Sequence, residues 1–429
     1  MSNVDKKAVF KSFIEKNEIL VVDKNPSSRS RLLKLLCDLG SKRHMVHAVG
    51  SFHEAVDILN SKNIGAILSE YFINGGSGFD LFKLIREREN GKNICMILVT
   101  SDMTQSTVAK AAEEDVDSYI IKPYTIESIQ ENLINTITLK VKPPKYIQII
   151  DEGKALIAQD KYEEAIAKIQ TALKLNPKPA LALFYIGQAE FLKQLAENAQ
   201  SSFKQGLSFN NIHFKCLTGL FDILMQKNEY FEAYEVVKKV AKYFPANPKR
   251  LEQVVRLAVQ TNNYQDMQFY YEIFTSLDER PTSSTNFIGA GMYVSGKYFL
   301  QNKAKEDALK LFENIAVSCS EFTKYPKAII DILIEHNMPD EAEKFLSRFS
   351  METRNDQDYL ISDYLVDSLK FKDNNRMVKF GLELYNKNIR DYKCMKIMIT
   401  AMEANGYKKE KIDPFIEEMN KLWPDKIAA

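Results

Sequence analysis

The amino-acid sequence predicts an α/β domain with a doubly wound, five-stranded parallel sheet, followed by an all-α helical solenoid. Two observations predict this arrangement. Five short apolar segments alternate with amphipathic helical patterns across residues 17–140, as in a parallel sheet with helices on both faces. Beyond residue 145 no strand pattern appears, and small residues recur at an interval of 34, which is typical of stacked helical repeats.

Each predicted strand is a short run of apolar, often β-branched residues, which suits a strand covered on both faces. The runs lie at residues 19–22, 45–49, 64–68, 95–99 and 118–121. The helical patterns begin at Pro26 and at Ser51, follow Gly78, surround Ala109 and extend over about residues 125–139. Five strand–helix units in succession specify a parallel sheet.

The composition is typical of a folded protein and excludes several functional classes. Hydrophobic residues make up 45% and charged residues 27% of the 429-residue chain, which excludes a disordered tail. Lys and Arg number 58 against 57 Asp and Glu, so the basic character of a nucleic-acid-binding protein is missing. The five cysteines are widely spaced, which fits a reducing compartment, and no signal peptide or membrane span is recognisable. We therefore expect a cytoplasmic protein that neither binds nucleic acid nor inserts into a membrane.

Polar residues follow four of the five predicted strands. Asp23 and Lys24 follow the first strand, Glu70 the third, Thr100 the fourth and Lys122 the fifth. In open parallel sheets, ligands bind at the carboxyl ends of the strands, so these side chains are expected to share one pocket.

The segments around these residues resemble the receiver domains of bacterial two-component response regulators, which have a flavodoxin-like fold. The resemblance covers about residues 17–140. Its motifs are VVDKNPSSR, LSEYF, the glycine at position 78, VTS and YIIKPYT. As a set these motifs are specific, whereas one of them alone would be weak.

The resemblance implies a role for each pocket residue. In the receiver family, the third-strand position is an aspartate that accepts a phosphoryl group. Two acidic residues after the first strand hold Mg²⁺, and a Thr or Ser and a Lys contact the phosphoryl oxygens. Asp23, Thr100 and Lys122 match this pattern. Glu70 and Lys24 depart from it, since Glu replaces the acceptor and Lys replaces the second acid.

The two departures change the charge of the predicted pocket. A standard pocket has three carboxylates and one lysine, whereas here Asp23 and Glu70 face Lys24 and Lys122, and the net charge is zero. With Lys24 near the metal position, repulsion of about 4 kcal/mol per unit charge at about 4 Å opposes a divalent cation. Without the metal, phosphoryl transfer loses its main charge stabilisation. We therefore expect a pseudo-receiver without catalytic residues, metal site or cofactor.

Two interpretations of Glu70 stay open at this point. Its carboxylate lies one methylene further out than that of Asp and can pair with Lys122 or Lys24. In the first interpretation, Glu70 mimics the phosphorylated state and holds the switch residues Thr100 and Tyr119 in an active-like arrangement. In the second, the pocket is a structural salt bridge and the domain is a docking module. A functional phosphoacceptor is the third alternative, which an adduct with acetyl phosphate or beryllofluoride would reveal.

The predicted domain boundaries follow from these patterns. Residues 1–16 form an N-terminal extension, and residues 17–140 form the receiver-like domain. The segment 141–145 contains two prolines and is the predicted linker. Residues 146–356 hold the helical repeats, and residues 357–429 hold C-terminal helices that form a last repeat or a cap.

The constant interval of the repeats places small side chains where two packed helices need them. Gly153 and Gly187 are one interval apart. The same interval separates Ala165, Ala199 and Ala233. Small residues let antiparallel helices cross closely, and a bulky residue four positions after each alanine is expected to fill the space toward the next unit. An insertion near 281–287 interrupts the spacing, which then resumes. The pattern resembles the tetratricopeptide repeat.

In the tetratricopeptide family, the first helix of each repeat lines a concave groove that binds other proteins. The corresponding positions here are Ile147, Ile150, Lys154, Phe184, Gln188, Phe191, Thr218, Asp222 and Met225. The set lacks the Lys, Asn and Arg clamp with which some family members hold the carboxylates of a chaperone tail. Its apolar members suit a helix or an extended peptide of another protein. In the alternative interpretation, Phe184 and Phe191 are core residues.

The sequence thus predicts a bacterial signalling adaptor or scaffold that recognises proteins and is not an enzyme. Its receiver-like domain is expected to offer its last two strand–helix units as a docking face or homodimer face, while the repeats bind partner proteins. One alternative is a phosphorylation-gated response regulator with the repeats as its output, against which Lys24 and Glu70 argue. Another is a nucleic-acid regulator, against which the neutral charge argues.

Overall fold

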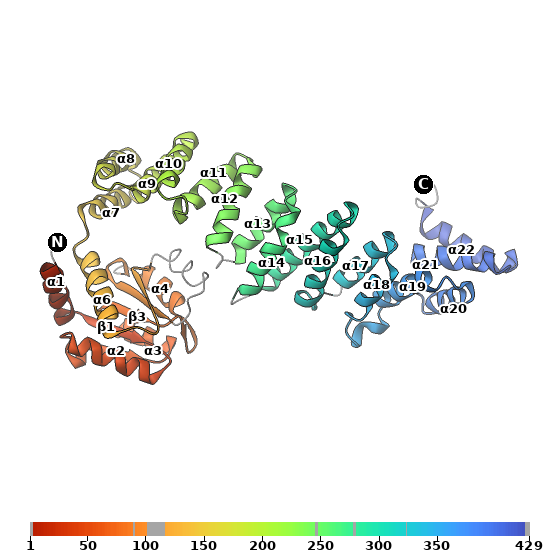
Figure 1. The fold of residues 1–429 in the computed structure, drawn as a ribbon, viewed down its shortest axis with the longest axis horizontal. Helices are drawn as coiled ribbons and strands as arrows, with labels where there is room; N and C mark the ends of the chain where they lie inside the picture. The colour runs from red at the N-terminus through yellow and green to blue at the C-terminus, as the bar shows by residue number, and fades with distance from the viewer. Residues whose placement is uncertain are drawn as a thin grey trace. The chain divides into compact units, whose positions relative to one another are not determined.

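The computed structural model describes residues 3–88, 91–100, 116–244, 248–277, 280–322 and 324–424. The chain divides into two units, Met1–Leu257 and Ala258–Ala429. The first unit begins with a β-sheet flanked by helices and continues into helix pairs, and the second consists of further helix pairs (Figure 1).

The sheet has five parallel strands in the order β2-β1-β3-β6-β7. They are β1 (Glu18–Val22), β2 (Val46–Val49), β3 (Ile64–Ser69), β6 (Cys95–Thr100) and β7 (Ser118–Ile121). The chain thus leaves the centre of the sheet in one direction after β1 and in the other after β2, which is the doubly wound topology. The predicted fold class is confirmed.

Helices cover both faces of the sheet because alternate strand residues point to opposite sides. Ile19 and Val21 pack with α2 (Pro26–Asp38) and α6 (Ile126–Val141). Leu20 and Val22 pack with α3 (Phe52–Ser61) and α4 (Gly78–Arg86) on the other face. A strand that is buried on both sides reads as a continuous apolar run, as the sequence showed. The helix expected around Ala109 falls outside the described residues.

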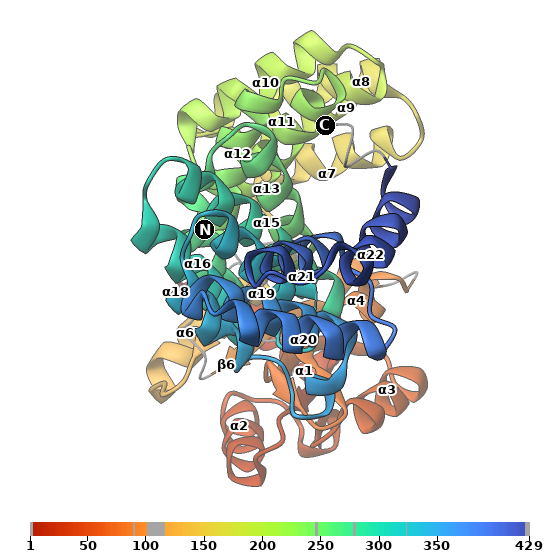
Figure 2. The same ribbon diagram turned by 90° about the vertical axis from the view of Figure 1, so that its right-hand side faces the viewer.

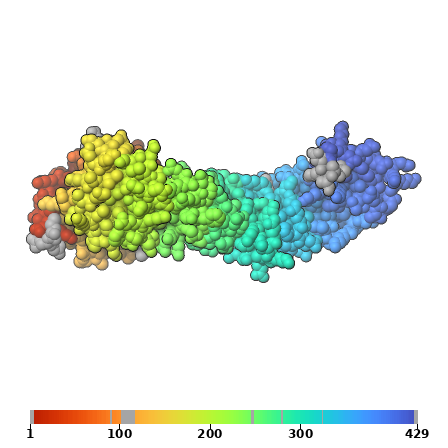
Figure 3. Space-filling model, turned by 90° about the horizontal axis from the view of Figure 1, so that it is seen from above, coloured from red at the N-terminus to blue at the C-terminus, as the bar shows by residue number. Residues whose placement is uncertain are grey.

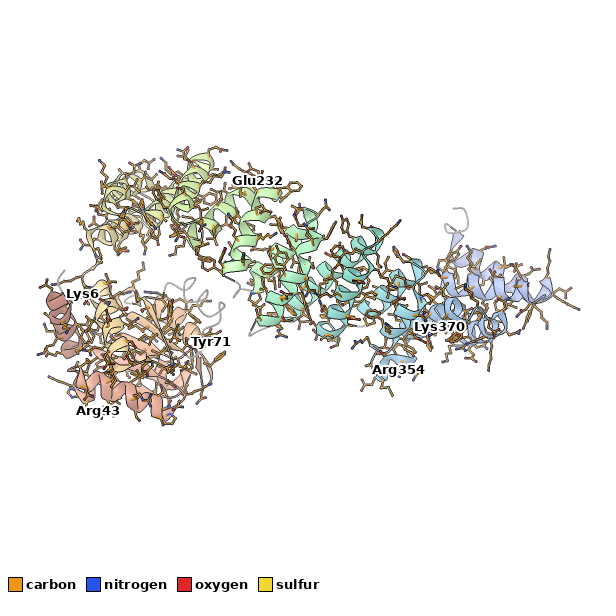
Figure 4. All side chains as sticks on the ribbon, viewed as in Figure 1. Lys6, Arg43, Tyr71, Glu232, Arg354 and Lys370 are labelled. Carbon is orange, nitrogen blue, oxygen red and sulfur yellow. The ribbon has the colours of Figure 1, made fainter. Side chains whose placement is uncertain are left out.

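Residues 1–16, which the sequence left as an extension, include a helix that completes the core. Helix α1 (Asn3–Lys16) lies along α6, and its Phe10 and Ile14 are buried in the same cluster as Leu133. Lys6, labelled in Figure 4, donates a hydrogen bond of 2.8 Å from Nζ to Oδ1 of Asn135. The apolar face of α1 therefore belongs to the receiver-like fold.

A short hairpin connects β3 to α4. It consists of β4 (Phe72–Ile73) and β5 (Gly76–Ser77), paired antiparallel. A Cβ atom at Gly78 would clash with the backbone carbonyl of Glu70, so only glycine lets the chain pass this closely behind the strand end. The hairpin therefore fixes the backbone on which the Glu70 side chain stands.

The repeat region of the first unit contains three complete antiparallel helix pairs. They are α7 (Lys145–Ile157) with α8 (Tyr162–Gln170), α9 (Ala180–Leu192) with α10 (Ala196–Phe209), and α11 (Phe214–Gln226) with α12 (Tyr230–Tyr243). Consecutive pairs follow one another along the chain, as the yellow-to-green surface of Figure 3 shows. Helix α13 (Pro248–Gln260) begins the next pair.

The glycines lie where the sequence predicted close helix crossings. A Cβ atom at Gly153 would clash with the side chain of Ile169, and one at Gly187 would lie 2.6 Å from the ring of Phe203. A Cβ atom at Gly219, in the next repeat, would meet the same ring at 2.6 Å. Phe203 therefore fills the layer between two repeats, and the glycines make room for it.

The turns between paired helices recur with the interval that the sequence predicted. Asp160, Gln194, Asn228 and Asn262 are evenly spaced by that interval, and all adopt left-handed backbone conformations with φ between 59° and 63°. The next such turn, at Lys303, follows after a longer interval. The additional residues are accommodated in the long helix α15 (Thr282–Gln301), because they amount to about two helical turns and leave the repeat in register.

The second unit continues the same architecture to its end. Its helices after α13 are α14 (Met267–Ser276), α15, α16 (Lys305–Ser318), α17 (Lys324–Glu335), α18 (Pro339–Leu346), α19 (Gln357–Phe371), α20 (Asn374–Asn386), α21 (Tyr392–Ala404) and α22 (Lys409–Leu422). Residues 357–422 form two helix pairs around one core, with α19, α20 and α21 side by side in Figures 1 and 2. The turns at Lys372 and Gly406 are again separated by the interval of the first repeats.

Candidate functional site

The carboxyl ends of four neighbouring strands bring the predicted pocket residues together. Asp23 follows β1, Glu70 follows β3, Thr100 ends β6 and Lys122 follows β7. Since these strands are adjacent and parallel in the sheet, all four residues reach the same edge.

Lys122 links the two acidic residues of the pocket. Its Nζ atom donates a hydrogen bond of 2.7 Å to Oδ2 of Asp23 and a second, shorter one to Oε2 of Glu70. The Asp23 and Glu70 side chains are buried and Lys122 is mostly buried. An ammonium group shared by two buried carboxylates is a strongly coupled arrangement, because few water molecules are near enough to screen the charges.

Asp23 is bound by further donors that the sequence analysis did not single out. Its Oδ1 accepts a hydrogen bond of 2.8 Å from the backbone amide of Asn25, and its Oδ2 accepts one of 2.6 Å from Oγ of Ser28. Ser28 stands in the first turn of α2, which begins at Pro26 behind the capping side chain of Asn25. The serine five positions after Asp23, in that first turn, was the signal that could have indicated it.

The hydrogen bonds shift the pKa values of Asp23 and Lys122. Burial alone would raise the pKa of Asp23, but the hydrogen bonds from Lys122, Ser28 and the Asn25 amide outweigh it and lower the pKa below its usual range. Burial alone would lower the pKa of Lys122, but the hydrogen bonds and charges of Asp23 and Glu70 outweigh it and raise the pKa. Both groups are therefore held in their charged forms.

Lys24 lies outside the buried residues of the pocket. Its side chain is exposed, and its ammonium lies 5.8 Å from the centre of the Phe72 ring, which is also exposed. Successive side chains of an extended segment point to opposite sides. Asp23 therefore points into the pocket and Lys24 points to solvent. The expectation of a lysine near the metal position stays a prediction. The buried set is Asp23, Glu70 and Lys122, with a net charge of −1 and not zero.

The residues of this pocket do not fit a divalent cation. Each carboxylate oxygen already accepts a hydrogen bond, since Oε1 of Glu70 takes the backbone amide of Tyr71 at 3.3 Å. A cation would have to displace the Lys122 ammonium or bind close to it, against like-charge repulsion. Magnesium also requires near-octahedral oxygen ligands, and Lys24 supplies none.

The two predicted switch residues lie in different environments. Thr100 is buried, and its carbonyl accepts a hydrogen bond of 2.7 Å from the amide of Lys122. Tyr119, on β7, is 45% exposed. The tyrosine ring therefore is not packed in the interior beside Thr100.

The predicted groove residues lie on α7, α9 and α11, and Ile150 is buried in the repeat core. Phe184 is half-buried, stacks on Phe203 with ring centres 5.8 Å apart and belongs to the edge of the repeat core. Gln188, Phe191, Thr218 and Met225 are partly exposed, and Asp222 is exposed. Phe184 thus packs against the core of the repeats, which agrees with the alternative interpretation that it is a core residue.

Two lysines and a tyrosine add polar groups to the same helices. The ammonium of Lys154 lies 5.4 Å from the Tyr185 ring centre, and that of Lys215 lies 5.8 Å from it. These helices line part of a cavity through Ile147, Ile150, Lys154, Leu181, Tyr185 and Lys215, and receiver-domain residues, among them Arg86, Asp117 and Lys140, line another part of it. Tyr185 and Lys215 were missed because the expected positions followed a family pattern in which they do not line the groove.

The described part of the chain holds no metal cluster and no membrane-spanning helix. No group of three or more His, Cys, Asp or Glu side chains in the described part of the chain is placed to hold a metal ion. None of the described helices is both long and apolar enough to cross a membrane.

Comparison with known protein families agrees with this architecture. The model of the response regulator receiver domain matches residues 19–134, and a tetratricopeptide repeat model matches residues 150–206. The chain therefore contains a receiver domain and tetratricopeptide repeats. Together they make it a signalling protein with a protein-binding region.

Individual relatives cover one part of the chain at a time. The chemotaxis protein CheY of Pseudomonas aeruginosa is 28% identical over 116 residues, which are 27% of this chain and 92% of that protein. The two-component response regulator ORR3 of Oryza sativa subsp. indica is 27% identical over 123 residues, which are 28% of this chain and 91% of that protein. The solved structure of a tetratricopeptide repeat protein from Parabacteroides merdae is 13% identical with a TM-score of 0.29, covering 64% of this chain and 98% of that one.

Proposed function

We propose that this chain is a signalling adaptor whose receiver domain does not run a phosphorylation cycle and whose repeats bind partner proteins. The observation that carries the first half is Glu70 at the acceptor position, with its carboxylate paired to Lys122. In the receiver family a lysine at this position contacts the phosphoryl oxygens, whereas here Lys122 pairs with the longer Glu70 side chain, and Lys24 stands in place of the second acid.

The charges explain why phosphoryl transfer is unfavourable in this pocket. The phosphoryl group carries negative charge that Mg²⁺ normally neutralises, and here both acids that remain are already bound to protein donors. The acceptor position holds Glu70, whose carboxylate is engaged by Lys122 and by the Tyr71 amide. Attack on a phosphoryl donor would first require breaking the buried ion pair.

Of the two interpretations of Glu70, the structural salt bridge is the better supported. A mimic of the phosphorylated state would have to draw Tyr119 toward Thr100, yet nearly half of the tyrosine surface is exposed. The receiver domain then serves as a fixed docking module. Formation of a homodimer through its last two strand–helix units stays a prediction.

The repeats supply the protein-binding half of the proposal. The cavity surface formed by α7, α9 and α11 combines partly exposed apolar side chains such as Ile147 and Leu181 with the ammonium groups of Lys154 and Lys215. Such a surface suits a peptide segment of a partner that carries apolar side chains and a carboxylate. Protein recognition, and not catalysis, is the proposed role of the chain.

The decisive experiment treats the full chain with acetyl phosphate, or with beryllofluoride, in the presence of Mg²⁺. Intact-mass spectrometry and fluorine NMR would show a covalent phosphoryl group or a bound fluoride complex. We expect neither in the natural chain. A matched variant with Lys24→Asp and Glu70→Asp restores the family residues and is expected to form the adduct. A stable adduct on Glu70 of the natural chain would overturn the proposal and favour a phosphorylation-gated regulator.

A second experiment addresses the repeats. Binding partners are captured with the natural chain and with the double variant Lys154→Glu and Lys215→Glu. We expect the charge reversal to release partners that bind through the groove, while Lys238→Glu, on α12, has no effect. Partners that remain bound to all three proteins would show that recognition takes place on another surface.

A further inference from the structure

The carboxylate of Asp23 is held by three donors, two from the beginning of α2 and one from the residue after β7. Oδ1 accepts from the Asn25 amide at 2.8 Å. Oδ2 is shared by Oγ of Ser28 at 2.6 Å and by Nζ of Lys122 at 2.7 Å. The two donors on Oδ2 act together, because each fixes the same oxygen from a different side.

The position of Ser28 is set by the beginning of α2. The Asn25 side chain accepts hydrogen bonds from the amides of Ser27 and Ser28, at 2.9 and 3.1 Å. The helix cap therefore orients the Ser28 backbone, and the hydroxyl points back at the end of β1. Ser28 lies outside the set of residues that the receiver family uses for phosphoryl transfer.

We propose that Ser28 is a positioning residue whose hydroxyl fixes the Asp23 carboxylate against Lys122 and so determines how firmly Lys122 closes the pocket. The inference deepens the proposed function, since it rests on a receiver pocket that is closed by its own lysine. In this proposal Ser28 orients the Asp23 carboxylate, and the carboxylate in turn holds the Lys122 ammonium in the pocket.

Among the described residues, Ser28 and Lys122 are the side chains that donate hydrogen bonds to the Asp23 carboxylate. Only 2% of the Asp23 surface is exposed, so water has little access to an oxygen that loses a donor. A buried carboxylate that loses a hydrogen bond becomes more free to rotate and binds its remaining partner with poorer geometry. Lys122 would then depend on Glu70 alone, and its ammonium would spend more time toward solvent.

The other charged groups near Asp23 do not offer the same support. Arg29 donates a hydrogen bond of 2.6 Å to the backbone carbonyl of Asp23 and not to its carboxylate. Glu70 repels Asp23 and binds the same lysine. The phenol of Tyr124 makes a side-chain hydrogen bond with Ser28, and the hydrogen bonds to Asp23 come from Lys122, Ser28 and Asn25.

The test measures how fast Lys122 reacts with an amine-acylating reagent, by mass spectrometry of the full chain. Lys140 is a matched internal control, because its side chain has the same exposed fraction, 19%, and is also paired with an aspartate, Asp117. In Ser28→Ala, we expect the acylation of Lys122 to become about threefold faster or more, with Lys140 unchanged. In Ser28→Thr, which keeps the hydroxyl, we expect the natural rate.

The outcomes separate positioning from a general effect on folding. Equal acceleration of Lys122 and Lys140, or no change at Lys122, would overturn the proposal. If Ser28→Ala does not fold, Ser28→Cys provides the comparison, since a thiol donates weakly, and an unchanged Lys122 rate in that variant would also overturn it. The proposed function is tested separately, by treating the natural chain with acetyl phosphate. A phosphoryl adduct there would overturn the proposed function without bearing on the role of Ser28.

Discussion

The ammonium of Lys24 lies 5.8 Å from the centre of the Phe72 ring, on the exposed rim of the receiver pocket. A cation over an aromatic ring at an exposed site contributes about 0.5–1 kcal/mol, so this pair stabilises the rim only slightly. Lys122, by contrast, joins two buried carboxylates. Of the two lysines near the pocket, only Lys122 closes it, and the two should respond very differently to substitution.

Replacing Lys122 by methionine is predicted to destabilise the receiver domain and to create an affinity for divalent cations. The change leaves Asp23 and Glu70 buried without a counter-charge, and breaking a buried pair in this way costs about 3–5 kcal/mol. Millimolar Mg²⁺ or Mn²⁺ should then raise the melting temperature of the variant, because a bound cation restores the missing charge. Thermal unfolding with and without the cation measures both effects. A variant that melts at the same temperature in both conditions would contradict the metal prediction.

Replacing Lys24 by methionine is the matched change on the rim. We expect a loss of about 1 kcal/mol or less in the free energy of unfolding, since the ammonium is exposed and lies beside the Phe72 ring. No response to Mg²⁺ is expected, because Lys122 still binds both acids. Urea unfolding of the variant next to the natural chain measures the difference. A loss as large as that of Lys122→Met would mean that Lys24 enters the pocket in solution.

The stability that the pocket contributes should be lost at both ends of the pH range. The pKa of Asp23 is below its ordinary value of 3.8, so its contribution is complete above that value and disappears as the pH falls through the lowered pKa. The pKa of Lys122 is above its ordinary value of 10.5, so its contribution is complete below 10.5 and disappears as the pH rises through the raised pKa. Urea unfolding of the natural chain and Asp23→Asn across pH 2–11 checks this. The two proteins should differ most in the middle of the range, and a constant difference would contradict it.

The sequence predicted the sheet well because its strands are buried on both faces and its helices begin at strong caps. The pocket residues Asp23, Glu70 and Lys122 were identified because the carboxyl ends of parallel strands meet. The sequence pattern did not indicate two features of the pocket. The direction of Lys24 depends on the alternation of side chains at the end of β1, and the hydroxyl of Ser28 depends on how the first turn of α2 faces back to the sheet.

In the repeats, the interval predicted the glycine crossings but not the full extent of the array. Small residues at a fixed spacing mark a helix crossing wherever they occur. The pairs after residue 357 keep the turn geometry at Lys372 and Gly406 without keeping the glycine and alanine positions. Backbone conformation at the turns therefore persists where the side-chain signature is lost. Helix α1 was missed for a different reason, since two buried residues in a polar segment, Phe10 and Ile14, give little periodicity.

Substitution of Ile14 by alanine is predicted to cost about 2–5 kcal/mol of receiver stability. The side chain is fully buried between α1 and the rest of the core, so its removal leaves a cavity as well as lost contact. Lys11→Ala, on the exposed side of the same helix, is the control and should change stability by no more than a few tenths of a kcal/mol. Chemical unfolding of the two variants gives the comparison. Equal stability of both would show that α1 does not pack on the receiver domain in solution.

Phe203 lies between two glycines, and enlarging either of them should loosen the first repeats. Added methyl groups at Gly187 or Gly219 would lie 2.6 Å from the phenylalanine ring, well inside contact distance, so either the ring or the helix must move. Overpacking of this kind costs about 1–3 kcal/mol.

Hydrogen–deuterium exchange resolved by peptide is the suitable measurement, because a chain of many repeats does not unfold in one step. Gly187→Ala should speed exchange in α9 and α10, and Gly219→Ala should speed it in α10 and α11, while the receiver domain is unaffected. Combining either change with Phe203→Leu should recover part of the protection, since the smaller side chain vacates the space that the methyl group enters. If the glycine variants exchange as slowly as the natural chain, the ring does not fill the layer between the two repeats, and the close crossings of α9 with α10 and of α10 with α11 have another origin.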